Sequence, residues 1–315
     1  MTRALVFPGQ GSQAIGMGAD LARAYPAAKA VFDEVDEALG EALSRIIAAG
    51  PEDQLTLTRN AQPALMAVSL AVFRVIEDRT GRTLDQLASF VAGHSLGEYS
   101  ALAAAGALSV SDTARLLRRR GEAMQRAVPV GEGAMAALMG LDFAAAQEIA
   151  AAAAARTGGV CQAANDNAPG QVVISGASAA VQAAIDIAGE KGAKRAVLLP
   201  VSAPFHCALM APAAEEMREA LAEVTVRAPV VPLVANVTAA PVTDPVEIRE
   251  LLVRQVTGTV RWRESVAWLV AEGVGELVEV GAGKVLSGLA RRIDRSLGAR
   301  TVGTPEDLDA FLATL

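Results

Sequence analysis

One serine in the chain lies in a setting that favours nucleophilic catalysis. Residues 93–97 read Gly-His-Ser-Leu-Gly and match the pattern G-x-S-x-G, between an apolar stretch at 89–92 and a helical pattern at 98–105. In a strand-turn-helix of this kind, the serine hydroxyl is exposed above the sheet, and the N–H of Leu96 points where an oxyanion would form. The glycines leave room for a strained backbone. The segment therefore predicts Ser95 as a nucleophile.

A serine nucleophile needs a base that takes its proton, and the chain has two histidines. The side chain of His94 diverges from that of its neighbour Ser95, so we interpret it as a structural histidine that supports the turn. His206, in the loop 201–207, is the remaining candidate base. An orienting acid is not evident, because most acids between Ser95 and His206 lie in predicted helices. His206 also lies too far from the C-terminus for the order of an α/β-hydrolase, and the chain has no Asp-Gly pair for a patatin-like dyad. We infer a Ser–His dyad whose imidazole is held by a group other than a carboxylate.

Three consecutive arginines at 118–120 precede Gly121, and we predict that they end a helix that begins near Ser111. Cations stabilise the C-terminal end of a helix, so Arg118 and Arg119 are expected to be solvated there. Three consecutive positions cover about 300° of a helix, so one of the three is expected to face inward. A buried guanidinium beside the serine would bind a carboxylate through two hydrogen bonds. The spacing alone does not identify which arginine this is.

Two glycine-rich segments resemble cofactor motifs and lack the context that these motifs require. Residues 9–14 fit the loose dinucleotide pattern, but Asp33 and Glu34 fall inside a predicted helix at 27–39 instead of at the end of a strand. Residues 281–284, Gly-Ala-Gly-Lys, lack the Walker spacing. We therefore expect no bound cofactor.

Composition excludes several classes of protein. Hydrophobic residues make up 52% of the 315 residues and charged residues 20%, a balance opposite to that of disordered chains. No uncharged apolar run is long enough to span a bilayer, and the apolar start at 4–7 is too short for a signal peptide. The net charge of −7 argues against general nucleic-acid binding. Cys161 and Cys207 form no CxxC pair and no metal-ligand spacing, so we expect a reduced, cytoplasmic protein without a metal site.

The order of predicted elements indicates an α/β fold of two units. Apolar strands at 4–7, 89–92 and 276–280 each lead through a glycine turn into a helix, which is typical of a parallel sheet covered on both faces. We predict that residues 1–129 and 200–315 form a large α/β-hydrolase-like domain with this parallel sheet.

Residues 130–199 are predicted to form a small domain inserted into the large one. The pattern between residues 134 and 199 is strand-helix-strand-strand-helix-strand, the order of a ferredoxin-like unit. Its predicted strands are 134–139, 159–163, 171–175 and 195–199, its helices are 143–155 and 179–190, and a turn is expected around 167–170.

Four segments together resemble a known family. They are Phe-Pro-Gly-Gln-Gly-Ser-Gln at 7–13, Gly-His-Ser-Leu-Gly-Glu-Tyr at 93–99, Asn-Ala-Pro-Gly-Gln at 167–171, and the block that ends at His206. In residues and order they resemble the malonyl-CoA:acyl carrier protein transacylases over nearly the whole chain. The resemblance implies ping-pong transfer of a malonyl group from malonyl-CoA to an acyl carrier protein for fatty-acid synthesis, by a monomer without a cofactor.

The resemblance also implies roles for individual residues. Ser95 matches the nucleophile, His206 the base, and Gln255 the glutamine whose backbone carbonyl orients the histidine. Gln10 and Leu96 match the two backbone N–H donors of the oxyanion hole, and Arg120 matches the arginine that binds the malonyl carboxylate. Gln62, Asn165 and Asn167 match residues that line the pocket.

Phe205 departs from the serine that precedes the histidine in some bacterial members. It resembles the phenylalanine of malonyl-selective polyketide acyltransferases, and Leu96 in place of glutamine favours the same choice. We therefore expect malonyl to be preferred over methylmalonyl. A hydrophobic wall alone gives about 10- to 200-fold discrimination per methyl group.

An acidic chain needs a local basic patch to bind an acidic carrier protein. We predict that Lys284, Arg291, Arg292 and the nearby Arg295 form part of it. Three alternatives stay open: a serine thioesterase or hydrolase, a free-standing acyltransferase that serves a polyketide synthase or malonate metabolism, and a non-catalytic carrier-binding subunit.

Overall fold

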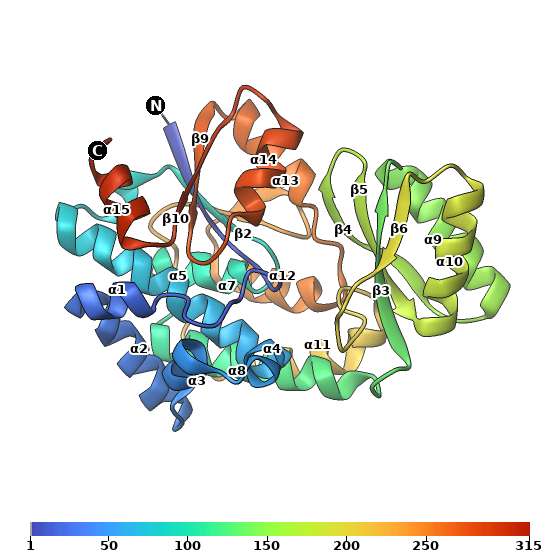
Figure 1. The fold of residues 1–315 in the computed structure, drawn as a ribbon, viewed down its shortest axis with the longest axis horizontal. Helices are drawn as coiled ribbons and strands as arrows, with labels where there is room; N and C mark the ends of the chain where they lie inside the picture. The colour runs from blue at the N-terminus through green and yellow to red at the C-terminus, as the bar shows by residue number, and fades with distance from the viewer. Residues whose placement is uncertain (1) are drawn as a thin grey trace.

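The computed structural model describes residues 2–315, which form a six-stranded and a four-stranded sheet, each packed against helices (Figure 1). The large sheet has the order β10-β9-β1-β2-β7-β8. Its strands are β1 (Thr2–Phe7), β2 (Phe90–Gly93), β7 (Leu233–Ala235), β8 (Ala240–Val242), β9 (Val274–Val280) and β10 (Gly298–Val302). Neighbouring strands are parallel except for β7 and β8, which are antiparallel and close enough in the chain to be joined by a tight turn.

The central strand β1 is buried on both faces, which explains its continuous apolar sequence. Leu5 and Phe7 pack in a core with helices on one face, and Ala4 and Val6 pack in a second core on the other. The first core includes side chains of α2 (Pro26–Leu39), α5 (Thr58–Thr80), α7 (Gly97–Ala104) and α8 (Val110–Ala127). The second core includes side chains of α13 (Trp262–Ala271) and α14 (Val285–Ile293).

The large unit contains further helices around these two cores (Figure 1). They are α1 (Ala19–Ala24), α3 (Leu43–Ala49), α4 (Glu52–Thr56), α6 (Leu84–Leu87), the 3₁₀ turn η1 (Ala208–Met210), α11 (Ala211–Ala222), α12 (Pro245–Thr257) and α15 (Pro305–Leu312). Within residues 2–315, no helix combines the length and the apolar character that crossing a membrane requires.

The second sheet is antiparallel and has the order β4-β5-β3-β6. Its strands are β3 (Gly133–Met139), β4 (Cys161–Ala168), β5 (Gln171–Ala177) and β6 (Arg195–Leu198), and its helices are α9 (Phe143–Thr157) and α10 (Ser178–Glu190). The two helices share a separate core with the sheet. The α/β class with a parallel-strand sheet and a small ferredoxin-like unit is therefore confirmed. All four strands fall inside residues 130–199, and the domain boundaries themselves stay a prediction.

Two local predictions were wrong. Strand β4 continues to Ala168 instead of ending at 163, because it pairs with β5 along its length and also bridges Val260 of the large unit. Helix α8 does not end at the three arginines but runs through Gly121 to Ala127. A Cβ on Gly121 would lie 2.6 Å from the Cα of Arg59, so this glycine serves the close approach of α8 to α5 and does not terminate the helix.

The exposure predicted for two of the arginines on α8 also needs correction. The side chain of Arg118 is only 13% exposed and pairs with Glu41. Arg119 lies among three acidic residues, Glu216 and Glu219 on α11 and Glu223 directly after it, with Glu216 at 3.3 Å. Arg120 is the arginine that faces inward.

Candidate active site

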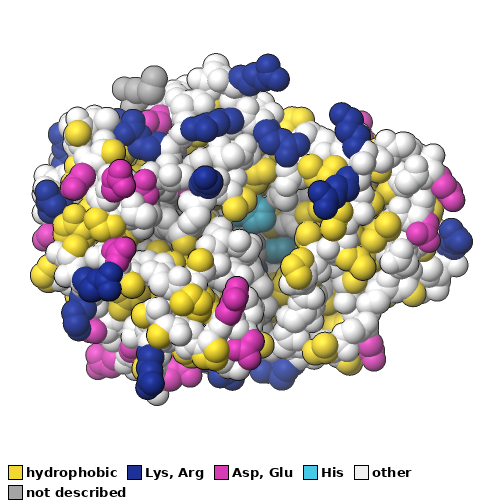
Figure 2. Space-filling model, viewed as in Figure 1, with side chains coloured by type: hydrophobic (Ala, Val, Ile, Leu, Met, Phe, Trp, Pro, Cys, Tyr) yellow, Lys and Arg dark blue, Asp and Glu magenta, His cyan; other side chains and the backbone are white. Residues whose placement is uncertain are grey.

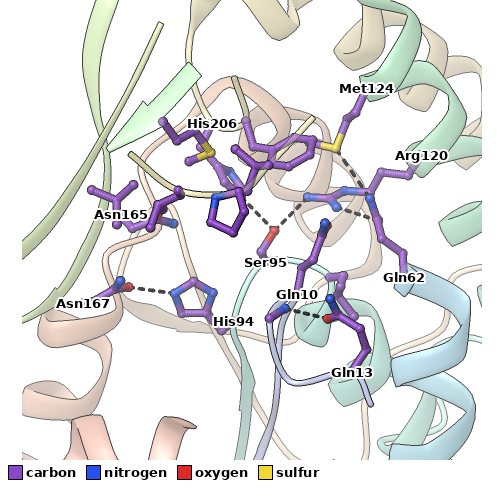
Figure 3. Close-up of a pocket in the computed structure, with 18 residues that line it drawn as sticks. Gln10, Gln13, Gln62, His94, Ser95, Arg120, Met124, Asn165, Asn167 and His206 are labelled. Atoms are coloured by element: carbon purple, nitrogen blue, oxygen red, sulfur yellow. Dashed lines mark hydrogen bonds between the residues drawn. The ribbon is translucent and has the colours of Figure 1, made fainter. Parts of the chain in front are cut away.

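A cavity of about 330 Å³ lies between the large sheet and the small sheet (Figure 3). It opens on the face shown in Figure 2, where the histidines are visible in a hollow. Nine of the residues predicted for the site line it: Gln10, Gln62, Ser95, Leu96, Arg120, Asn165, Asn167, Phe205 and His206. The tertiary structure thus gathers residues from both units around one hydroxyl group.

Ser95 occupies a sharp turn between β2 and α7. Its φ of 53° lies in the left-handed region, which is strained for a side chain other than glycine. The two flanking glycines are required by sterics. A Cβ on Gly93 would lie 1.9 Å from the carbonyl carbon of Gly97, and a Cβ on Gly97 would lie 2.2 Å from the carbonyl oxygen of Phe7. The predicted strand-turn-helix is present, and its turn presents the hydroxyl to the cavity.

The tight turn at Ser95 has no room for a side-chain methyl group at Gly93. We expect Gly93→Ala to lower the midpoint of thermal unfolding by several degrees, because the clash is with backbone that cannot move aside. Gly288→Ala is the matched control, since this glycine lies in α14 with no atom within 4 Å of an added Cβ. The control is expected to be neutral or slightly stabilising. Equal thermal midpoints for both variants would contradict the steric role of Gly93.

His206 lies where a base for Ser95 would be needed. Its Nε2 lies 2.7 Å from Ser95 Oγ, and its Nδ1 lies 2.9 Å from the backbone carbonyl oxygen of Gln255. A carbonyl only accepts hydrogen bonds, so Nδ1 carries the proton and Nε2 is free to accept one from the serine. The geometry has a carbonyl where many serine enzymes have a carboxylate, as the sequence led us to expect. His206 itself has a φ of 58°, so the loop is strained at the base as well.

Burial and the charge of Arg120 keep this base neutral. Burial is the larger cause, and together with the nearby guanidinium it lowers the pKa of His206 to about 3. The hydrogen bond to the Gln255 carbonyl acts in the opposite direction and does not offset them. A neutral imidazole at physiological pH is the form that can deprotonate Ser95.

Arg120 is a buried cation without an acidic partner. It is 1% exposed, and no carboxylate of residues 2–315 lies within 4.0 Å of its guanidinium. Amide oxygens hold it instead: Nη1 donates to Gln62 at 2.7 Å, and Nη2 donates to Gln255 at 2.8 Å. Nη2 also lies 3.2 Å from Ser95 Oγ, and the ring of Tyr99 lies 5.6 Å away. An unpaired buried guanidinium beside a nucleophile is a ready-made site for a carboxylate.

Two backbone N–H groups at the cavity are free to bind an oxyanion. Leu96 follows the nucleophile at the start of α7, and Gln10 lies in the turn after β1. In the part of the chain that the structure describes, neither N–H donates to a protein group, whereas the Ser95 N–H is occupied by Asn236. The side chain of Gln10 is turned toward Thr58, at 3.3 Å.

The rest of the wall combines apolar and amide side chains. Phe205 is 8% exposed and lies with Met124, Met135 and Leu199 on the apolar side. Asn165 and Asn167 come from β4 and not from the turn predicted near them. Asn167 Oδ1 lies 2.8 Å from His94 Nε2, so His94, which also lines the cavity, connects the two units there (Figure 3).

Comparisons with known proteins agree with this geometry. A family model described as acyl transferase domain matches residues 4–298. The malonyl CoA-acyl carrier protein transacylase of Bacillus subtilis (strain 168) is 48% identical over 312 residues, which cover 99% of this chain and 96% of the relative. The crystal structure of an acyl-carrier-protein-S-malonyltransferase from Bartonella henselae matches with a TM-score of 0.97 and 60% identity, over 100% of this chain and 99% of the other. The chain belongs to the malonyl-CoA:acyl carrier protein transacylase family.

Membership of this transacylase family makes the protein an acyltransferase. A further relative was solved as a malonyl-transacylase in complex with a type II PKS acyl-carrier protein. It matches with a TM-score of 0.96 and 42% identity, over all of both chains.

The basic residues predicted for carrier binding lie at both ends of α14: Lys284 directly precedes the helix, and Arg291 and Arg292 lie in its last turn. Lys284, Arg291 and Arg292 are exposed, and in Figure 2 several Lys and Arg side chains lie above the opening of the cavity. Two of them also make structural contacts: Arg291 donates to the carbonyl of Ala299 at 3.0 Å, and Arg292 donates to the side chain of Gln171. The N-terminal N–H groups of α14 are already bonded to Glu279 and do not form an anion site.

Sequence reasoning missed two buried polar residues behind the nucleophile. Glu98 follows the serine motif by one residue on α7, and Asn236 follows β7. Burial raises the pKa of Glu98 to about 7, although hydrogen bonds from Gln255 and Asn236 lower it. The signal for Glu98 was a carboxylate in an otherwise uncharged helix. Asn236 carries no local signal, because its role depends on β7 lying beside β2.

Proposed function

We propose that this protein transfers the malonyl group of malonyl-CoA to the phosphopantetheine thiol of an acyl carrier protein, and so supplies chain-extender units for fatty-acid synthesis. The observation that carries the proposal is the unpaired Arg120 guanidinium, buried within hydrogen-bond distance of the nucleophile. A malonyl group ends in a free carboxylate, which is the partner that this cation lacks. The names of the relatives support the same substrate.

The first half-reaction loads the serine. His206 Nε2 accepts the proton of Ser95 Oγ, which attacks the thioester carbonyl while the N–H groups of Gln10 and Leu96 bind the oxyanion. The carbon–sulfur bond then breaks, and the imidazolium returns its proton to the departing CoA sulfur. In the second half-reaction the carrier thiol loses its proton to His206 and attacks the malonyl ester. Ser95 leaves and recovers its proton.

Arg120 supplies orientation and selectivity in this scheme. Arg120 lines the cavity from α8, with Nη2 at 3.2 Å from Ser95 Oγ, and its guanidinium can bind the malonyl carboxylate through paired hydrogen bonds. An acetyl group would leave the guanidinium buried and unpaired. All groups in the scheme come from this chain and the two thioester partners, so the proposal includes no cofactor and no metal.

The test is intact-protein mass spectrometry after mixing the protein separately with malonyl-CoA, acetyl-CoA and methylmalonyl-CoA. We expect a malonyl adduct that persists in buffer and is discharged by a carrier-protein thiol, with weak labelling by the other two thioesters. An adduct that water removes without a carrier would indicate a thioesterase instead. The absence of any adduct would favour the alternative that the protein is a non-catalytic carrier-binding subunit. Methylmalonyl labelling equal to malonyl labelling would contradict the selectivity assigned to Phe205.

The carrier is the second part to test. One relative was solved with a type II PKS acyl-carrier protein, so delivery to a polyketide carrier is the second candidate function. Discharge rates of the malonyl-enzyme with a fatty-acid carrier and a polyketide carrier, measured side by side, separate the two.

The rate of serine loading is expected to fall only at a pH far below the usual pKa of histidine. Because the pKa of His206 is lowered to about 3, the base stays neutral and the single-turnover rate should be flat from pH 8 down to about 5. Protonation at lower pH would remove the base and the rate. Rapid-quench measurement of malonyl-Ser95 formation between pH 4 and 8 checks this. A limb near pH 6.5 that also persists in Glu98→Gln would show that His206 titrates normally.

Reversing two charges on α14 is expected to weaken carrier binding. The double variant Arg291→Glu, Arg292→Glu should raise KM for the acidic carrier about tenfold and leave serine loading by malonyl-CoA unchanged. The matched control reverses Arg156 and Lys191, which are exposed on or next to the outer helices α9 and α10. An unchanged KM for the carrier, or equal effects in both double variants, would remove this patch from the docking surface.

The proposed enzyme acts as a monomer in the cytoplasm. Cys161 and Cys207 are both free thiols, which agrees with a reducing compartment. Light scattering coupled to size exclusion, with serine loading measured on the separated peak, tests the monomer.

A further inference from the structure

Gln255 is the residue through which the three parts of the site are connected. Its backbone carbonyl accepts from His206 Nδ1, and its side-chain oxygen accepts from Arg120 at 2.8 Å. Its side-chain nitrogen donates to the backbone oxygen of Ser95 at 2.9 Å and to Glu98 Oε2 at 3.0 Å. One glutamine therefore contacts the base, the carboxylate-binding cation and the nucleophile.

Glu98 determines which way the Gln255 amide faces. The nitrogen of the amide is directed to two close acceptors and to Asn236 Oδ1 at 3.5 Å, so the oxygen is directed to the donor Arg120. Without the carboxylate, one of the two close acceptors is lost and the reversed amide becomes less unfavourable. A reversed amide would point N–H groups at a guanidinium.

Asn236 holds the strained turn in the same way. Its Oδ1 accepts from the Ser95 N–H at 2.8 Å, and its Nδ2 donates to the carbonyl of Gly93 at 2.7 Å. The side chain therefore spans the turn in which Ser95 has a positive φ. Its own backbone N–H donates to Glu98 Oε2 at 3.0 Å, which joins the two residues in one network.

Stability of the fold does not require polar side chains at Glu98 and Asn236. Glu98 is 1% exposed and Asn236 is fully buried, and Glu98 Oε1 has no hydrogen-bond partner in residues 2–315. A buried carboxylate with an unpaired oxygen makes a core less stable than an apolar side chain of similar size would. Such destabilising residues are expected where a functional site requires them.

We propose that Glu98 and Asn236 are positioning residues for the acylation of Ser95. Asn236 holds the nucleophile turn, and Glu98 fixes the Gln255 side chain on which Arg120 rests. The inference deepens the proposed function and rests on it for the malonyl substrate. Neither residue lines the cavity beside Ser95.

The test compares apolar and conservative variants by the single-turnover rate of serine loading at saturating malonyl-CoA. Glu98→Leu is expected to lower this rate about 100-fold, because small displacements of a reacting group have effects of that size. It should also reduce the preference for malonyl-CoA over acetyl-CoA at least tenfold. Glu98→Gln keeps an acceptor oxygen and should recover most of both quantities. Asn236→Asp keeps the acceptor for the Ser95 N–H, loses the donor to Gly93, and should slow loading about tenfold without changing the preference.

Ser100→Ala is the control for a merely structural effect. Ser100 lies on the same helix, is fully buried, and its hydroxyl has no partner among the described residues. This variant should load at the wild-type rate. The proposal is overturned if Glu98→Leu loads within twofold of wild type, or if Glu98→Gln is no faster than Glu98→Leu at equal thermal midpoints. Should Glu98→Leu not fold, loading by Asn236→Asp within twofold of wild type overturns it.

A fluorophosphonate probe separates this inference from the proposed function. The probe phosphonylates an activated serine without any acyl-group recognition. If the wild-type protein reacts with the probe and not with malonyl-CoA, the proposed substrate fails. The probe rates of the same variants then decide the positioning roles, with a slower reaction of Glu98→Leu and Asn236→Asp supporting them and unchanged rates overturning them.

Discussion

Replacing Ser95 by alanine is expected to abolish formation of the malonyl-enzyme and to lower the transfer rate about 10⁴- to 10⁶-fold. The hydroxyl is the only group that the scheme uses to carry the acyl chain, and it lies 2.7 Å from the base. Intact-protein mass spectrometry gives the adduct directly, and carrier malonylation gives the rate.

His206→Ala separates the nucleophile from its base. This variant keeps the hydroxyl and loses the acceptor of its proton. Its rate of serine loading should fall by about as much as the transfer rate falls in Ser95→Ala, because the members of a dyad act as a unit. Slow labelling by the reactive malonyl thioester should still map to Ser95. An adduct that survives in Ser95→Ala, or a His206→Ala variant that loads at the wild-type rate, would contradict the dyad.

Replacing Arg120 by methionine is expected to produce the second-largest effect and to change selectivity. The variant keeps an unbranched side chain of similar length and removes the cation, so malonyl loading should fall about 10²- to 10³-fold. Acetyl loading should stay equal or rise, because no unpaired guanidinium remains beside the acyl group. Competition between malonyl-CoA and acetyl-CoA, read by mass spectrometry, measures the ratio.

Arg119→Met is the matched control for this variant. The neighbouring arginine points away from the cavity toward acidic residues near α11, so its removal should leave the ratio unchanged. Removing Arg120 also removes a cause that lowers the pKa of His206. The acid limb of residual loading should therefore move to higher pH in Arg120→Met and not in Arg119→Met. A preserved preference for malonyl-CoA in Arg120→Met would exclude it as the carboxylate site.

The tight turn at the nucleophile could be predicted because its requirements are local. Residues 93–97 combine a strand end, two small residues and a helix start, and the structure shows that any larger residue at Gly93 or Gly97 would clash. With two histidines in the chain, the base followed by elimination. The ferredoxin-like unit could be predicted for the same reason, because its pattern of strands and helices lies within one continuous segment.

The helix that carries Arg120 shows where local rules fail. Glycine after three arginines is a common helix end, but here the missing Cβ allows α5 to pack against α8. That contact joins residues about sixty positions apart, so no local pattern contains it. Only the direction of α8 against α5 decides that Arg120 faces the cavity while Arg118 and Arg119 meet acids near the surface.

The amino-acid sequence by itself determined the class of fold, and it was enough to predict a nucleophile, its base and a carboxylate-binding cation, because each of these predictions rests on residue type and short spacing. Tertiary structure alone decided how these groups are oriented. The Gln255 carbonyl that replaces an acid, the Asn236 side chain across the turn and the Glu98 carboxylate behind it come from three different elements. Parallel strands bring the ends of β2 and β7 to the same edge of the sheet, so hydrogen bonds form there between residues more than a hundred positions apart.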